Sequence, residues 1–322
     1  MKALDGKVAV VAGATRGTGR GIALALGEAG AIVYGTGRST RAEPRKATSR
    51  RSGKAAFELA KRPETIEETA EMVEACGGVC IPVRVDHTAP EQVEKLFKRV
   101  RQEQGRLDIL VNDVWGGDEL GEQKPFWKHS LQKGLLMLER AVHSHIITSH
   151  YAAPLMIETG QGLIVEITDG DHFSYRGSLF YDLVKTSVIR LAFVMATELR
   201  QHKITALALT PGFIRSEAML DYMGVTEANW QEAIKKRPDF IESETPFYVG
   251  RAVAALAADP YVFKKTGRVY AAWDLGPEYG ITDLDGRQPN IPKWIEENMP
   301  EFTWKSCDAA FYEYWGLPLG KA

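Results

Sequence analysis

Tyr181 and Lys185 are a pair of residues in this sequence whose types and spacing suggest chemistry. They lie four positions apart in a segment, about Phe180 to Arg200, whose apolar spacing predicts a helix, so both side chains are expected on one helix face. A free phenol is a poor base near neutral pH, but an adjacent ammonium group stabilises the phenolate and lowers its pKa. Such a pair can donate a proton to a developing alkoxide or take it back. The same spacing also arises by chance, with the ring packed on the lysine stem, so the surrounding elements must decide.

A glycine-rich segment near the N-terminus has the composition and position of a phosphate-binding loop. It lies between a β-branched run, Lys7 to Ala12, and a helical pattern from Gly19 to Ala29. Glycines there let the backbone approach a pyrophosphate, and the helix N-terminus offers free N–H groups and a positive dipole end. The residues expected to bind a dinucleotide here are Gly13, Thr15, Arg16, Gly17, Thr18 and Gly19. The alternative is a glycine-rich turn without a ligand.

The charges near this loop favour NADP(H) over NAD(H). A site selective for NAD usually places a carboxylate after the second strand, where it would repel a 2′-phosphate. No acidic residue occurs from Tyr34 to Ala42, whereas Arg16 and Arg38 offer guanidinium groups suited to a phosphate. The alternative is that both arginines are solvated surface residues.

The order of the predicted elements is that of an α/β protein with a parallel sheet. Short, near-continuous apolar runs alternate with helical patterns, which suits strands covered by helices on both faces. We therefore predict a single Rossmann-like, doubly wound domain over residues 1–275 with a seven-stranded parallel sheet. The predicted strands are Lys7–Ala12, Ala31–Tyr34, Cys80–Val85, Leu107–Val111, Leu163–Thr168, Ile204–Leu209 and Val269–Ala272. The predicted helices are Gly19–Ala29, Thr65–Cys76, Glu91–Gln104, Leu131–Ile157 and Phe180–Arg200.

Three segments depart from this pattern. Residues 39–63, after the second strand, form a basic insertion where a tight connection would be expected. Residues 276–322 form a C-terminal extension rich in Trp, Tyr, Phe and Pro, which is expected to pack on the same domain. The segment from about Phe213 to Tyr248 carries several Met and aromatic residues, and we expect it to be a lid over an apolar substrate pocket.

The loop, the strand order and the Tyr-x3-Lys pair together resemble the short-chain dehydrogenase/reductase family over residues 5 to about 275. The Gly-x3-Gly-x-Gly spacing, Asn112 to Gly116 and Thr210 to Ser216 carry the same resemblance. It implies hydride exchange between a nicotinamide and a carbonyl or alcohol, with Tyr181 exchanging the proton and Lys185 holding the nicotinamide ribose. It also implies cofactor contacts from Asp86, Asn112, Pro211, Gly212, Ile214 and Ser216. The residues from Ala271 onward are similar to one branch of that family with a C-terminal extension.

Two positions depart from the family pattern. Where the family has a serine that hydrogen-bonds the substrate oxygen, this chain has Thr168 followed by Asp169. Thr168 offers a hydroxyl and is the favoured catalytic residue, because an ionised Asp169 would repel a developing alkoxide. Asp169 could contribute if it is protonated or if it binds a polar group of the substrate. The family's proton relay uses an asparagine that aligns with Ala141 in this chain. The sequence therefore does not identify a residue for this step of the relay.

The sequence therefore predicts an NADP(H)-dependent oxidoreductase that acts on a small carbonyl or alcohol substrate with apolar or aromatic bulk. The alternative is a catalytically weak NADP(H)-binding sensor or regulatory protein on the same fold. The resemblance also implies a homodimer or homotetramer.

Other classes of function are not favoured. The formal net charge of −2 gives no global attraction to nucleic acid or anionic lipid, and the basic insertion is more simply a solvated or cofactor-closing loop. His143, His145 and His150 lack a matching acid or cysteine, so no metal site is expected. Three cysteines, no signal-peptide pattern and no apolar run long enough for a membrane span predict a soluble, cytoplasmic protein.

Overall fold

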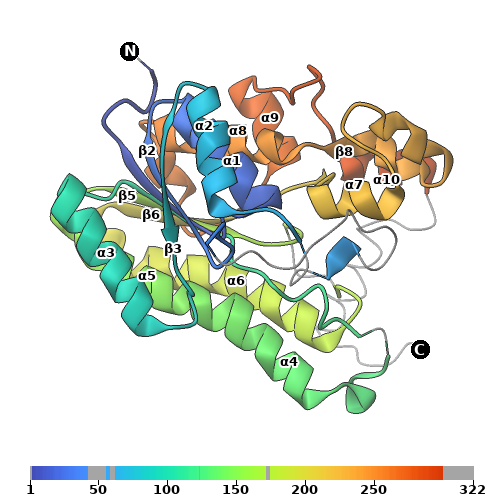
Figure 1. Cartoon of the computed structure of the whole chain (residues 1–322), viewed down its shortest axis with the longest axis horizontal. Helices are drawn as coiled ribbons and strands as arrows, with labels where there is room; N and C mark the ends of the chain where they lie inside the picture. The colour runs from blue at the N-terminus through green and yellow to red at the C-terminus, as the bar shows by residue number, and fades with distance from the viewer. Residues whose placement is uncertain (1, 43–55, 59–61, 123, 172–174, 300–322) are drawn as a thin grey trace.

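Parallel strands form the central sheet, which has seven members within the described part of the chain (Figure 1). The computed structural model describes residues 2–42, 56–58, 62–122, 124–171 and 175–299. The spatial order is β3-β2-β1-β4-β5-β6-β9, and every neighbouring pair is parallel. The strands are β1 (Val8–Ala12), β2 (Ile32–Gly37), β3 (Val79–Arg84), β4 (Ile109–Asn112), β5 (Gly162–Ile167), β6 (Ile204–Thr210) and β9 (Val269–Ala271). This confirms the predicted Rossmann-like fold and its seven-stranded sheet.

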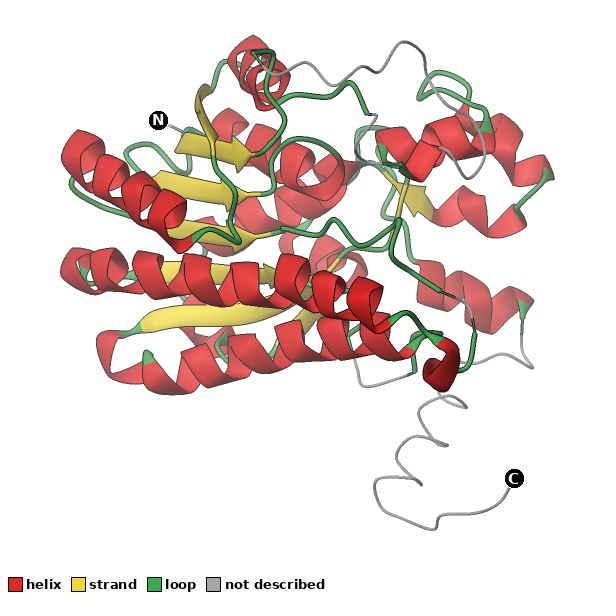
Figure 2. Cartoon of the chain, turned by 60° about the horizontal axis from the view of Figure 1, so that its bottom comes forward, coloured by secondary structure: helices red, strands yellow, loops and turns green. Residues whose placement is uncertain are grey.

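Helices cover both faces of the sheet, which explains why its strands are apolar throughout (Figure 2). Along β1, Ala9 and Val11 pack with the helices of one face, whereas Val8 and Val10 pack with those of the other. The first face carries α1 (Gly17–Glu28), α2 (Ile66–Ala75) and α8 (Pro246–Ala258). The second carries α3 (Pro90–Gln104), α5 (Ser144–Thr159) and α6 (Leu179–Glu198).

The predicted long helix from Leu131 to Ile157 is one helical run interrupted by a π turn. It consists of α4 (Leu131–Leu138), the π turn Glu139–His143 and α5. Ala141, aligned with the family's relay asparagine, lies inside this turn and is buried. Single π turns inside α-helices are frequent at functional sites, and this one adjoins the pocket through Arg140.

The lid and the C-terminal extension flank the sheet's carboxyl edge. They comprise β7 (Phe213–Ile214), α7 (Glu217–Met223), β8 (Ser243–Glu244), α9 (Ala272–Tyr279) and α10 (Ile291–Asn298). Short 3-10 turns lie at Phe126–Lys128, Arg200–His202, Trp230–Lys235, Pro238–Glu242 and Val262–Lys265.

Two boundaries differ from those expected. Phe247 and Tyr248 belong to α8, and Tyr248 packs in the core, so the segment predicted as a lid overlaps the first turn of a core helix. Helix α9 crosses the boundary expected at residue 275, and its Leu275 is fully buried in the core. The parts of the insertion at 43–55 and 59–61 and the end of the extension at 300–322 lie outside the described residues.

Candidate active site

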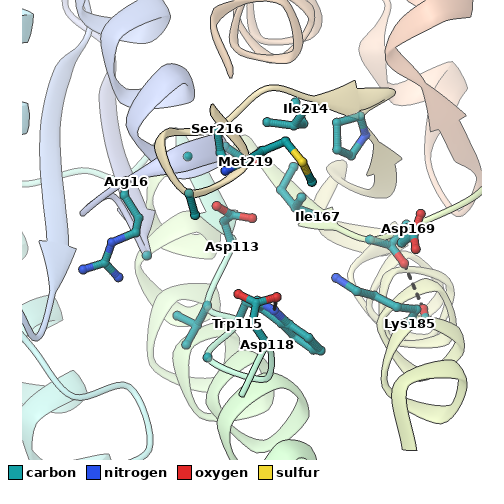
Figure 3. A pocket seen from close by; sticks show the side chains of 18 of the residues that line it. Arg16, Asp113, Trp115, Asp118, Ile167, Asp169, Lys185, Ile214, Ser216 and Met219 are labelled. Atoms are coloured by element: carbon teal, nitrogen blue, oxygen red, sulfur yellow. Dashed lines mark hydrogen bonds between the residues drawn. The ribbon is translucent and has the colours of Figure 1, made fainter. Parts of the chain in front are cut away.

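A pocket of about 760 Å³ lies at the carboxyl ends of the strands. This is the edge at which a doubly wound sheet binds ligands, where the chain leaves β1 and β4 in opposite directions. Figure 3 shows Arg16 at one end of the pocket and Asp169 and Lys185 at the other, with Asp113, Trp115 and Asp118 between them. The pocket therefore joins the predicted phosphate loop to the predicted acid–base pair.

The phosphate loop folds tightly onto the strand beside it. Gly13 has a φ of +98°, and a Cβ there would lie 2.5 Å from the Asp113 carbonyl oxygen, so only glycine fits. The N–H of Gly17, at the start of α1, donates to the Glu217 carboxylate at 2.8 Å, and Arg20 pairs with the same carboxylate at 3.1 Å. The helix N-terminus thus already binds an anionic group, as a pyrophosphate site must. Gly13, and Gly17 at the start of α1, therefore fit the pyrophosphate of a dinucleotide.

The two predicted phosphate-binding arginines both line the pocket, and each has a carboxylate neighbour. Arg16 donates through Nε to Glu64 at 3.1 Å, while its Nη2 is buried without a hydrogen bond to any described residue. Arg38 is 44% exposed, and its Nη1 lies 3.7 Å from Asp86. Glu64 was missed by sequence reasoning, because it follows the insertion and is 48 positions from Arg16.

Helix α6 presents Tyr181 and Lys185 to the pocket. Phe180, Val184 and Val188 anchor the helix on its buried face, which turns the next positions toward the pocket. The Tyr181 hydroxyl donates to Asp169 Oδ2 at 2.6 Å. Burial and the Asp169 carboxylate raise the pKa of Tyr181 well above its usual range.

Lys185 lies among carboxylates and an aromatic ring. Its Nζ is 4.6 Å from the centroid of the Trp115 ring and 5.7 Å from that of Tyr181. Burial lowers the pKa of Lys185, and the nearby carboxylates of Asp169, Asp113 and Asp118 partly oppose this. The ammonium group of Lys185 thus faces several carboxyl groups as well as the phenol.

Asp169, rather than Thr168, contacts the Tyr181 hydroxyl. The Thr168 hydroxyl donates to the backbone carbonyl of Lys185 at 2.9 Å, and the residue is only 2% exposed although it borders the pocket. Thr168 borders the pocket while its hydroxyl ties the end of strand β5 to helix α6, and its role as the hydroxyl that faces the substrate stays a prediction.

Two expected cofactor residues lie behind the pocket wall. Asn112 is fully buried, and its Nδ2 donates to Glu166 at 2.6 Å and Ser149 at 2.9 Å. Gly19 packs against the Gly13 carbonyl, where a Cβ would lie at 2.5 Å. Neither belongs to the pocket lining, and both hold neighbouring parts of the loops in place, so their contacts with a cofactor stay a prediction.

The remaining expected cofactor residues line the pocket. They are Gly13, Thr15, Gly17, Thr18, Asp86, Pro211, Gly212, Ile214 and Ser216. The Ser216 hydroxyl also accepts from the Met219 N–H at 3.3 Å and so caps α7.

His145 has a structural role beneath the pocket. Its Nδ1 lies 2.6 Å from Glu166 Oε2 and its Nε2 lies 3.1 Å from the Val114 carbonyl. Through these two contacts the ring joins strand β5 to the loop after β4. The histidine fixes the backbone of the loop after β4, as does Arg140, which donates to the Gly116 carbonyl at 2.9 Å.

Apolar side chains contribute to the pocket wall. Among the lining residues are Trp115, Phe213, Met219, Trp273, Ile291 and Ile295. Ile291 and Ile295 belong to α10, so the C-terminal extension supplies part of the wall. Neither isoleucine was predicted to contribute to a pocket.

The described residues also bear on two other features, a metal site and a membrane span. They contain no group of three or more His, Cys, Asp or Glu side chains arranged to hold a metal ion. No helix among them has the length and apolar character needed to cross a membrane.

Comparisons with known proteins agree with this geometry. A family model described as short chain dehydrogenase matches residues 46–223. The chain is 34% identical over 289 residues to dehydrogenase/reductase SDR family member 1 of Mus musculus, which covers 88% of this chain and 85% of that protein. The Homo sapiens protein of that name gives the same values.

More distant proteins share the fold. A 7alpha-hydroxysteroid dehydrogenase of Clostridium sardiniense is 29% identical, covering 69% of this chain and 76% of its own length. The solved structure of a short-chain type dehydrogenase/reductase from Mycobacterium marinum matches with a TM-score of 0.61 and 23% identity, covering 83% of this chain and 94% of its own.

Proposed function

Because the chain belongs to the short-chain dehydrogenase/reductase family, near the branch of SDR family member 1, we propose that it is an NADP(H)-dependent oxidoreductase that reduces a carbonyl or oxidises the matching alcohol. The observation that carries this proposal is the pocket itself. One wall holds the phosphate loop and the opposite end holds Tyr181 with Lys185.

In this proposal, the end of the pocket that holds Tyr181 and Lys185 carries out the proton transfer. A bound nicotinamide supplies the hydride to the carbonyl carbon. Tyr181 gives its proton to the carbonyl oxygen, and the Lys185 ammonium steadies the negative charge that develops on the phenol. Trp115 excludes water beside Lys185, which strengthens these electrostatic effects.

The choice of NADP(H) is supported by Arg38 and Arg16 at the far end of the pocket. Arg38 is open to solvent, and its 3.7 Å pairing with Asp86 is loose enough for a phosphate to replace. Arg16 keeps a buried nitrogen without a described partner, although Glu64 takes its Nε.

The proposed substrate is a small molecule with apolar or aromatic bulk, since Trp115 lies beside Tyr181 and Lys185, and Phe213, Trp273 and the α10 isoleucines also line the pocket. We also propose a homodimer or homotetramer in the cytoplasm. The cytoplasmic setting is supported by Cys76 and Cys80, which are free thiols.

Replacement of Tyr181 by Phe tests the function. Y181F should lower kcat/KM for NADPH-dependent reduction by about 10²- to 10⁴-fold, because the phenol is the proton donor, while NADPH binding changes little. The measurement is NADPH oxidation against a panel of aldehydes, ketones and quinones, with fluorescence titration of NADPH as the control. Turnover that survives in Y181F would contradict the role of the phenol. NADPH binding with no turnover in either form would instead favour the sensor.

A further inference from the structure

We propose that Asp169 passes a proton to Tyr181 during reduction, so that the reducing form of the enzyme is the one in which the Tyr181 hydroxyl and the Asp169 carboxyl are both protonated. This inference rests on the proposed reductase function and adds a residue outside the Tyr-Lys pair to its proton transfer.

The geometry places the two groups in direct contact. Asp169 follows β5, and its Oδ2 accepts the Tyr181 hydroxyl proton at 2.6 Å. Arg176 donates to the Asp169 backbone carbonyl, which fixes the residue above α6. The hydroxyl of the neighbouring residue Thr168 donates to the Lys185 backbone carbonyl. Asp169 therefore occupies the place of a polar partner to the phenol.

An ionised Asp169 opposes the reaction in two ways. The phenol's proton then points at the carboxylate instead of at a substrate oxygen. After proton transfer, a phenolate would stand 2.6 Å from a carboxylate, and two anions at that distance cannot both persist without a proton between them.

The other charges around the pair do not remove this conflict. Lys185 is the near cation, but Asp113 and Asp118 face it too, and Arg176 is the second cation close to both Tyr181 and Lys185. Beyond Asp169, Asp171 faces Asp274 of α9 and adds further negative charge. Ala141 supplies no polar group at the position of the relay asparagine.

A proton on Asp169 resolves both difficulties. The acid then donates to the phenol oxygen, which frees the phenol's own O–H for the substrate. In reduction, the carbonyl carbon gains the hydride, the carbonyl oxygen takes the Tyr181 proton, and the phenol oxygen takes the Asp169 proton. Asp169 is left as a carboxylate and regains a proton from pocket water before the next turnover.

The substitution Asp169→Asn tests this, because an amide donates to the phenol oxygen without carrying charge. Wild-type kcat/KM for reduction should fall about tenfold per pH unit on the alkaline side, the slope of one required proton. D169N and Asp169→Ser should lose this limb and vary less than about twofold over the same range. Asp274→Asn, the same change at an exposed carboxyl outside the pocket lining, should keep the limb.

A second readout is independent of activity. In protein labelled with 3-fluorotyrosine, the fluorine resonance absent from Y181F reports the surroundings of Tyr181. In wild type it should shift with a single-proton titration over the pH range of the activity limb, and in D169N it should stay constant. An unchanged limb in active D169N, or the same titration in both proteins, would overturn the donation of a proton by Asp169. A wild type without turnover but with this titration would remove the reductase proposal and leave the contact between the two titrating side chains standing.

Discussion

Arg38 offers the sharpest test of cofactor choice at the scale of one side chain, because it is exposed at the pocket edge and only loosely paired with Asp86. Arg38→Ala should weaken NADPH binding by about 10- to 100-fold, the value of a hydrogen bond to a charged group, and change NADH binding less than about twofold. Titration of both dinucleotides measures this.

A matched control is Arg41→Ala, which removes the same charge from an exposed pair with Glu71 outside the pocket. It should leave both affinities nearly unchanged. Equal losses of NADPH and NADH binding in R38A would refute a 2′-phosphate contact by this arginine.

Glu244 is a buried carboxyl behind the wall of the same pocket. It lies against the Gly212 backbone, where a Cβ would come within 2.5 Å of its Oε2, and it is fully buried. Burial raises the pKa of Glu244 to about 8, and the Gly212 backbone and Arg215 offset this only in part. The side chain is therefore accommodated in its protonated form.

This makes part of the protein's stability dependent on pH. The folded-state pKa of Glu244 exceeds the unfolded value of 4.5, so its contribution is fully present below that value and is lost as pH rises toward 8. Relative to wild type, Glu244→Gln should gain up to about 5 kcal/mol of unfolding free energy at pH 8.5 compared with pH 4. Urea denaturation at both pH values measures it. Glu28→Gln, at an exposed site on α1, is the control, and an equal response of the two variants would contradict the assignment.

The adjacent residues Thr168 and Asp169 mark what sequence could settle at this scale. Hydroxyl chemistry and charge repulsion both favoured Thr168, but neither argument predicts which of the two side chains turns toward Tyr181 on α6. The strand ends at Ile167, so the backbone beyond it no longer follows strand alternation. The Tyr181–Lys185 pair was predictable because helix geometry fixes neighbours at this spacing.

At the scale of elements, α4 and α6 lie side by side and share an exposed apolar surface. Leu131 and Leu135 on α4 are 70% and 59% exposed, and Leu179 and Leu183 on α6 are 42% and 45% exposed. Each pair is spaced by one helical turn and lies on one side of its helix, and we propose that the four form one stripe over the two helices. Such a surface suits the association of two copies of the chain.

Charges in this stripe should dissociate an oligomer. Leu135→Asp combined with Leu183→Asp should raise the dissociation constant at least about 100-fold, because each carboxylate buried against apolar surface costs at least about tenfold. Sedimentation velocity across a concentration series measures this. Leu284→Asp, at a residue 61% exposed in the extension, should leave the assembly intact. A wild type that sediments as a monomer at every concentration would rule out the stripe as an interface.

For the elements themselves, continuous apolar runs were enough to predict the seven strands. The π turn was not predictable, since Glu139 to His143 continues the helical pattern and differs only in its backbone hydrogen bonds. Helix α10 was also missed, because Pro292 near its start and the aromatic residues around it gave no clear apolar period.

At the scale of the whole molecule, the sheet order placed the pocket, but the segments that close it came from distant parts of the chain. Glu64 reaches Arg16, and its neighbour Arg62 reaches Asp221 of the lid at 2.8 Å. Local pattern identifies an element and its exposed face, whereas contacts across 48 or 159 positions depend on how the whole chain packs. This is why the fold was predictable and the partners of the arginines were not.

The hydrogen bond from Gly17 to Glu217 means that the lid carries its own occupant for the phosphate position. In the proposed function, a pyrophosphate that uses this N–H must replace the Glu217 carboxylate, because two anions cannot share one N–H. Glu217 stands on the first turn of α7, a helix that also contributes Met219 to the pocket lining. Binding of the proposed dinucleotide would then break the contact that joins the start of α1 to α7, so that the two events belong to one equilibrium.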